Sequence, residues 1–262
     1  MKSFFPFALL LSSFPSSGEC FSAPTTSTST AAAVPSKDEA HWLDVLKFDG
    51  QKPDFDVIAK TIDYTSQPGY VRFSLKDIPT DYYDKDYIFR GPIVGPINRE
   101  DLVRTNSLFG LDKSFPDLER KPFGFAVDPE NPFRVLFFER WIGTHTGELD
   151  LIGVLKAPPT GNKSVSPLFP FSITWTPDGK IIYEALTTAV DRFEGNTRGK
   201  VAVFGLLETA GISLDNSVGN PILRFQQKLN RFLNSPAQIY SKDEDIPSWW
   251  MSRARGADPN DM

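Results

Sequence analysis

The chain has 262 residues, of which 40% are hydrophobic, 13% aromatic and 23% charged, and its net charge is −5 at pH 7. These values are ordinary for a globular protein and exclude a fibrous, collagen-like or wholly disordered chain. Because the net charge is negative and the sequence shows no cluster of basic residues, we expect no nucleic-acid partner.

Residues 1–20 have the pattern of a signal peptide. Lys2 supplies a positive start, residues 4–11 form a short apolar stretch, and the small residues at 16–18 approach a cleavage point. Cleavage after Cys20 would remove the one cysteine of the chain, so we expect the mature protein to contain no disulfide.

Residues 21–36 have the composition of a transit peptide, because they are rich in Ser and Thr and contain no acidic residue. Phe21, Ala23 and Pro24 resemble the plastid-targeting signal of algae with secondary red plastids. That resemblance predicts a plastid protein that reaches the organelle through a signal plus a transit peptide. A secreted protein with a mucin-like linker is the alternative.

Helices are expected early in the mature chain. Apolar residues at 55, 58, 59 and 62 form one helical stripe, with Asp54 as its N-cap and a stop at residues 67–69. Residues 81–86 are expected to form a loop and 87–90 a short strand. Asn98 is a suitable N-cap for a helix over 99–108, which Gly110 would end.

Strands and turns dominate from residue 123 onward. The expected strands are 123–127, 133–144, 169–176 and 181–190, the last two joined by the turn 176–180. Helices followed by an antiparallel run predict an α+β domain over residues 37–200.

Residues 201–262 read as a C-terminal extension with a helix over 221–233 and a polar tail. Trp249 and Trp250 are expected to pack against the sheet or a partner, because adjacent Trp residues are seldom left exposed. Contact with a membrane surface is a weaker alternative. Phe137 and Phe138 must point to opposite faces of their strand, so we expect residues 221–250 or a second subunit to cover part of the outer face.

Four short motifs occur in order along the domain: Phe-Pro-Asp-Leu at 115–118, Gly-Thr-His-Thr-Gly-Glu at 143–148, Pro-Thr-Gly at 159–161 and Asp-Gly-Lys-Ile at 178–181. Together they resemble the SnoaL-like polyketide cyclases of the nuclear transport factor 2-like superfamily, over roughly residues 40–195. The resemblance implies a cone-shaped, curved antiparallel sheet packed on N-terminal helices, with an apolar pocket. It also implies acid–base chemistry that needs no metal or other cofactor.

Candidate site residues follow from this resemblance and from strand parity. His145 matches the histidine of the family, although a structural hydrogen bond is its plainer interpretation. The family's acid/base aspartate falls at Ser172, which has no useful pKa, so Glu148 and Asp150 are the tentative substitutes at the catalytic position. Glu139 and Trp141 share parity with His145. A buried Glu139 would be a perturbed acid, whereas a Glu139 paired with an arginine would be structural. The expected ligand-binding residues are Trp141, Glu139, Ser172 and Phe89.

Three functions fit the sequence. The first is a plastid protein that binds a small apolar or aromatic molecule, with cofactor-independent activity as an extension. The second is an active cyclase or isomerase that uses His145 with Glu148, Asp150 or Glu139. The third is a non-catalytic assembly or scaffold protein, which includes a homodimer formed through the outer sheet face. Two histidines and one cysteine without ligand spacing predict no metal site.

Overall fold

The structure, a computed structural model, describes residues 42–151, 155–214, 237 and 239–251. The chain divides into a unit of residues 1–36 and a unit of residues 37–262. Every described residue belongs to the second unit. The predicted signal and transit segments and the predicted helix 221–233 lie outside the described residues.

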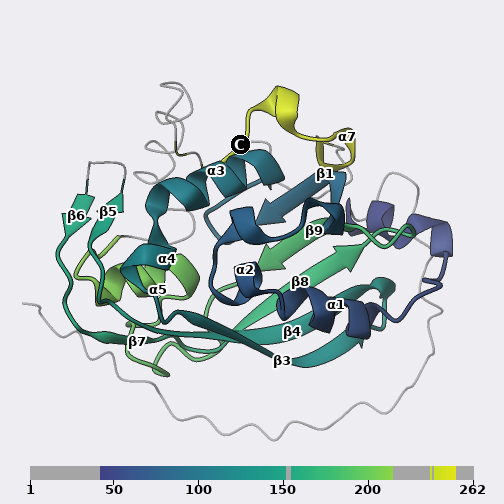
Figure 1. Ribbon diagram of the computed structural model, residues 1–262. Coiled ribbons are helices and arrows are strands. Elements are labelled where there is room, and N and C mark those ends of the chain that lie inside the picture. Colours follow the sequence, from purple (N-terminus) through teal and green to yellow (C-terminus); the bar gives the residue numbers. More distant parts are fainter. Residues whose placement is uncertain (1–41, 152–154, 215–236, 238, 252–262) are drawn as a thin grey trace, which may run out of the picture. The chain divides into compact units, whose positions relative to one another are not determined.

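One sheet organises this unit, with the strand order β2-β1-β9-β8-β4-β3 and with β7 also paired to β4 (Figure 1). All its strand pairs are antiparallel except β1 with β9, which run parallel. The fold class is therefore α+β with a curved, mainly antiparallel sheet, as predicted. The strands are β1 (Tyr83–Arg90), β2 (Ile97–Asn98), β3 (Glu119–Asp128), β4 (Asn131–Thr144), β7 (Lys163–Val165), β8 (Phe169–Trp175) and β9 (Ile181–Leu186), with a separate hairpin of β5 (Leu149–Leu151) and β6 (Leu155–Ala157).

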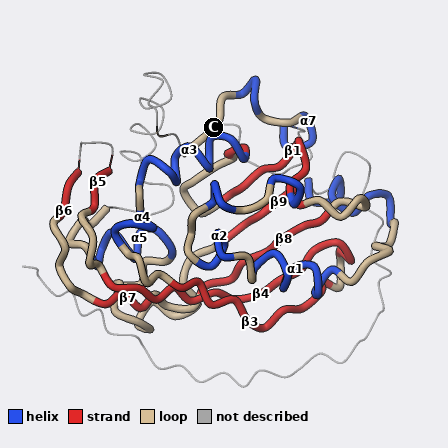
Figure 2. Tube along the Cα trace, in the orientation of Figure 1, coloured by secondary structure: helices blue, strands red, loops and turns tan. Residues whose placement is uncertain are grey.

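Short helices accompany the sheet, coloured blue in Figure 2. None of the helices that the structure describes is long and apolar enough to cross a membrane. The α-helices are α1 (Val57–Thr65), α2 (Pro68–Val71), α3 (Arg99–Phe109), α4 (Leu111–Ser114), α5 (Ala202–Thr209) and α7 (Ser248–Met251), and the 3-10 helices are η2 (Trp42–Gly50), η3 (Leu75–Asp77), η4 (Thr80–Tyr82) and η5 (Asp243–Asp245).

Local capping signals set the helix limits. Asn98 caps α3 by accepting a hydrogen bond of 2.9 Å from the Asp101 N–H, and Gly110 ends the helix with φ of 57°, as predicted. The predicted cap of α1 is wrong. Asp56, not Asp54, accepts hydrogen bonds from the N–H groups of Ile58 and Ala59, at 2.9 and 3.0 Å.

The core lies on one face of the sheet. Along β4, Phe137, Glu139 and Trp141 are buried, whereas Leu136 and Phe138 between them are 38% and 36% exposed. Helices α1 and α2 pack on the buried face with Val57, Tyr64 and Tyr70. Residues 201–210, assigned by the sequence to the C-terminal extension, also pack into this core, through Leu206, Leu207 and Ala210.

The C-terminal segment covers part of the opposite, outer face. Trp250 is only 2% exposed, and its ring lies 5.7 Å from that of Tyr183 on β9. The Trp249 indole donates a hydrogen bond of 3.0 Å to the Asp86 carbonyl on β1. The predicted packing of the two Trp residues against the sheet is confirmed. A second subunit or a membrane contact remains a prediction.

Candidate functional site

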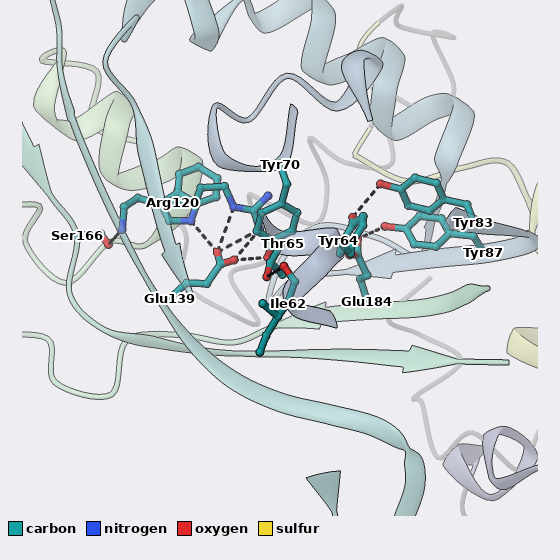
Figure 3. A network of polar contacts seen from close by, with 11 residues as sticks. Ile62, Tyr64, Thr65, Tyr70, Tyr83, Tyr87, Arg120, Glu139, Ser166 and Glu184 are labelled. Atoms are coloured by element: carbon teal, nitrogen blue, oxygen red, sulfur yellow. Dashed lines mark hydrogen bonds and ion pairs between the residues drawn. The ribbon is translucent and has the colours of Figure 1, made fainter. Parts of the chain in front are cut away.

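Two of the predicted site residues, Glu139 and Trp141, are in contact within a buried polar network on the core face. Figure 3 shows this network around Glu139. Arg120 of β3 holds the Glu139 carboxylate with two oxygen contacts of its Nη2 atom, at 2.9 and 3.1 Å. The Trp141 indole N–H donates to Glu139 at 2.8 Å, and the Tyr70 hydroxyl donates to it as well. Glu139 is thus paired with an arginine, the arrangement for which the sequence predicted a structural role.

Arg120 keeps its charge in this interior. Its guanidinium carbon lies 3.5 Å from the centre of the Tyr70 ring and 5.1 Å from that of Trp141. Burial by itself lowers the pKa of Arg120, but the charge and hydrogen bond of Glu139 together with Tyr70 and Tyr64 outweigh burial and raise it. Both charges act on a second acid nearby: the charge of Arg120 lowers the pKa of that acid, and the charge of Glu139 raises it.

That second acid is Glu184 of β9, which the sequence did not single out. Its side chain is buried, and its Oε2 atom accepts a hydrogen bond of 2.5 Å from the Tyr87 hydroxyl. Its Oε1 atom has no hydrogen-bond partner within the part of the chain that the structure describes. Burial raises the pKa of Glu184, and the hydroxyls of Tyr87 and Tyr64 offset this only in part. The buried Glu184 therefore holds its proton more tightly than an exposed glutamate does.

Tyrosine side chains connect the two acids. The hydroxyls of Tyr64 and Tyr83 lie 2.8 Å apart, and the Tyr64 ring contacts the Tyr70 ring at 5.0 Å. The Tyr83 ring lies 5.0 Å from that of Tyr87. Burial raises the pKa of each of these tyrosines, so all four remain neutral hydroxyls. We call this set the acid–tyrosine cluster; its members are Tyr64, Tyr70, Tyr83, Tyr87, Arg120, Glu139, Trp141 and Glu184.

The sheet register brings the cluster together. Glu184 lies beside Ile173 of β8 and Phe89 of β1, so it points to the core face with them. Phe89, a predicted ligand-binding residue, is half-buried against the same core. A sequence signal for the cluster exists in the two tyrosine pairs of residues 64–70 and 83–87, and in the acid at 184 inside an apolar strand.

His145 lies away from the cluster, where the motifs at 115–118, 143–148 and 159–161 contact one another. The Thr144 N–H donates to Asp117 at 2.6 Å, and the ring of Phe115 stacks on that of His145 at 5.0 Å. The His145 carbonyl accepts from the Gly161 N–H at 2.9 Å. The residues that carry the family resemblance thus hold three chain segments to one another.

The His145 ring is buried, and burial lowers its pKa, which favours the neutral form. Its Nδ1 atom accepts a hydrogen bond of 3.3 Å from the Thr160 N–H, so the proton of the neutral ring is on Nε2. Nε2 has no hydrogen-bond partner among the described residues. Because the basic nitrogen is occupied, this geometry favours the structural interpretation, and a catalytic His145 remains a prediction.

The tentative carboxylates Glu148 and Asp150 are not brought to the cluster. Glu148 is exposed. Asp150 lies on the β5–β6 hairpin, where Lys156 pairs with it at 2.8 Å and both side chains are largely exposed. Exposed carboxylates of this kind are ordinary surface groups, so the geometry does not support their predicted role.

The predicted position of Ser172 is wrong. Ser172 pairs with Leu136 of β4, and Leu136 points to the outer face. Trp141 has the opposite parity and points to the core. Because alternate residues of a strand point to opposite faces, Ser172 does not share a face with Trp141.

The described residues contain no group of three or more His, Cys, Asp or Glu side chains that could hold a metal ion. The cluster instead contains one carboxyl group that an arginine holds, that of Glu139, and one whose pKa burial raises, that of Glu184. Environments that separate two carboxyl groups in this way assign them different chemical roles. A neutral carboxyl beside tyrosine hydroxyls can donate hydrogen bonds to a carbonyl oxygen and stabilise negative charge that develops on it.

Comparison with known proteins gives structural likenesses only. No family profile matches the chain, and no curated protein matches it by sequence. A putative SnoaL-like polyketide cyclase from Jannaschia sp. CCS1 is similar at 17% identity, over 59% of this chain and 90% of that one, with a TM-score of 0.32. An NTF2-like protein from Exiguobacterium sp. 255-15 is similar at 12% identity, over 50% and 96%, with a TM-score of 0.33. A steroid delta-isomerase from Pseudomonas aeruginosa is similar at 11% identity, over 70% and 100%, with a TM-score of 0.29. Scores this low carry no argument about activity.

Proposed function

We propose that this protein binds a small apolar or aromatic molecule whose carbonyl oxygen accepts a hydrogen bond from Glu184. The observation that carries the proposal is the Oε1 atom of Glu184, which is buried and has no hydrogen-bond partner among the described residues. A buried polar group without a partner is costly, and a ligand oxygen would satisfy it. Aromatic side chains around the cluster supply apolar contact for the rest of such a molecule.

The hydroxyl of Tyr64 contacts that of Tyr83, and Tyr83 is one of the partly buried residues that border the core. We infer that a ligand reaches the cluster beside Tyr83 and that this ring moves when the ligand enters.

Proton transfer is the proposed extension of binding. When an external base, such as a hydroxide ion or the buffer, takes a proton from the carbon beside a ligand carbonyl, negative charge develops on the carbonyl oxygen. Hydrogen bonds from the neutral Glu184 carboxyl and from a tyrosine hydroxyl would stabilise that charge without a cofactor. Isomerase- and cyclase-type reactions share this step. Glu139 does not take part in the proposed step, because Arg120 holds it as an ion pair.

Titration of the full-length protein with two matched probes tests the proposal. Acetophenone carries a carbonyl group, and ethylbenzene is its hydrocarbon analogue. We expect acetophenone to bind about threefold to tenfold more tightly, the value of one buried hydrogen bond. Glu184→Leu should remove this preference, whereas Tyr82→Phe, outside the cluster, should keep it. Equal binding of the two probes by the wild type would overturn the proposal.

An assembly role is the second candidate, and a specific patch supports it. Phe123, Leu136 and Phe138 are 47%, 38% and 36% exposed on β3 and β4, and the two Phe rings lie 6.1 Å apart. Exposed apolar side chains that adjoin one another are typical of interaction surfaces. A homodimer through this outer face is the proposed assembly, and sedimentation at several protein concentrations tests it.

We also propose that the protein acts in the plastid. The support is the sequence of residues 1–36, in which Phe21 follows the expected signal cleavage point and the acid-free Ser/Thr stretch follows Phe21. Secretion is the alternative destination.

A further inference from the structure

Arg99 borders the acid–tyrosine cluster and has no acidic partner there. Its guanidinium carbon lies 4.5 Å from the centre of the Tyr83 ring, and its Nη2 atom donates a hydrogen bond of 3.2 Å to the Ile78 carbonyl. Its Nε atom is buried and without a hydrogen-bond partner in the described part of the chain. Arg120, the arginine within the cluster, is paired with Glu139.

The position of Arg99 at the start of α3 does not account for a positive charge there. Arg99 is the first residue of α3, and the partial positive charge of a helix N-terminus disfavours a cation in the first turn. The residues that follow it, Glu100 and Asp101, are the acidic ones that this position favours. Arg99 forms no ion pair with either of them or with any other described residue. No described residue therefore neutralises its charge.

The charge of Arg99 affects the pKa values of two tyrosines in the cluster. Burial raises the pKa of Tyr83 and of Tyr87, and the nearby guanidinium acts on both in the opposite direction. One aromatic ring, that of Tyr83, separates Arg99 from Tyr87, whose hydroxyl contacts Glu184. The Arg99 guanidinium and the Tyr87 ring thus both contact the ring of Tyr83.

We infer that Arg99 binds a carboxylate of the ligand, so that the ligand class is an apolar or aromatic keto acid. This inference rests on the proposed function, because Glu184 takes the carbonyl oxygen of the same molecule. The Nε–H and terminal N–H groups of a guanidinium suit the two oxygens of a carboxylate. A half-buried guanidinium is also only weakly hydrated, which makes it a good partner for an acid in an apolar setting.

The test compares para-acetylbenzoate with acetophenone, which lacks only the carboxylate. Both probes are titrated into the full-length protein, its Arg99→Gln variant and its Arg72→Gln variant, by calorimetry or ligand-observed NMR. Arg72 is a matched control, because it is exposed and also donates one hydrogen bond to a backbone carbonyl, that of Leu118 at 3.1 Å.

We expect the wild type to bind para-acetylbenzoate at least about tenfold more tightly than acetophenone. Arg99→Gln should abolish this difference and leave the affinity for acetophenone unchanged, whereas Arg72→Gln should preserve both affinities. Equal affinities in the wild type would overturn the inference, and so would an Arg99→Gln variant that weakens both probes alike, because that result indicates a structural role.

The Glu184→Leu variant separates this inference from the proposed function. If Glu184→Leu leaves acetophenone binding unchanged while Arg99→Gln selectively weakens para-acetylbenzoate, the role of Glu184 is wrong and Arg99 still binds acids. If Glu184→Leu weakens acetophenone and Arg99→Gln has no selective effect, the proposed function stands and the keto-acid inference fails. Absence of binding of both probes to the wild type contradicts both.

Discussion

The Tyr87 hydroxyl donates a hydrogen bond of 2.5 Å to Glu184, although 97 positions of the sequence separate the two residues. The parallel pairing of β1 with β9 creates this contact, since it aligns residues 88–90 with residues 183–185. The bond occupies one carboxyl oxygen and leaves the other for a ligand. The chemistry proposed for this protein therefore depends on the parallel strand pair of an otherwise antiparallel sheet.

The acid Glu184 should make stability depend on pH. Burial raises its pKa above the ordinary value of 4.5, so the folded state holds this proton more tightly than the unfolded state. Its contribution to stability is complete below pH 4.5 and is lost as the pH rises through the folded pKa. We predict that the unfolding free energy of the wild type, relative to that of Glu184→Gln, falls as the pH rises above this value. Urea unfolding of both proteins across the pH series measures it; a constant difference would contradict the prediction.

The Arg120–Glu139 pair should be costly to break from one side. Arg120→Met leaves a buried carboxylate without its counter-charge, and we predict a loss of about 3–5 kcal/mol in unfolding free energy. Glu139→Gln in the same chain removes that charge and keeps an oxygen for Trp141, so the double variant should recover part of the loss. Urea unfolding of the single and double variants measures these losses in unfolding free energy. Losses that simply add would show that the two side chains do not act as a pair.

The packing of Trp250 against the outer face should matter for solubility as well as stability. Trp250→Ala exposes Tyr183 and leaves space beside it, so we predict a loss of about 3–5 kcal/mol and concentration-dependent aggregation. Thermal unfolding and light scattering measure these effects. Phe193→Ala is the control, because Phe193 is 81% exposed and its removal should change neither quantity. A soluble Trp250→Ala variant of unchanged stability would argue against a structural role for the C-terminal segment.

The cellular destination of the protein can be tested separately from its proposed ligand binding. We predict that residues 1–36 fused to a fluorescent reporter direct it into the plastid of an alga with a secondary red plastid. Phe21→Ala should leave the reporter outside the organelle, whereas Ser22→Ala should not, since the signal resembles one that depends on the aromatic residue. A reporter found only in the medium would support secretion instead.

Sequence reasoning succeeded where local signals decide the structure. Asn98 and Gly110 fix the ends of α3 through contacts within a few residues, and the alternation along β4 fixes its buried face. Asp54 and Asp56 are two residues apart and equally suited to cap α1, so composition could not choose between them. The error at Ser172 came from counting along one strand without the register that sets its face.

The cluster itself could be predicted only in part. Glu139 and Trp141 share a strand, so parity placed them together before their contacts were known. The sequence analysis did not single out Glu184, since an isolated acid in a strand is usually exposed. Its burial depends on Tyr87 and Tyr64, which come from distant parts of the chain and from elements whose pairing the sequence pattern did not reveal.

The most direct test of the central claim is the carbonyl stretching frequency of bound acetophenone, measured by isotope-edited infrared spectroscopy. A hydrogen bond from the Glu184 carboxyl weakens the carbonyl bond, so we predict a lower frequency in the protein than in an apolar solvent. Glu184→Leu should return the frequency to the apolar value, while Tyr82→Phe should leave it at the wild-type value. A bound carbonyl that vibrates at the apolar-solvent frequency in the wild type, or one whose frequency does not change in Glu184→Leu, would contradict the account.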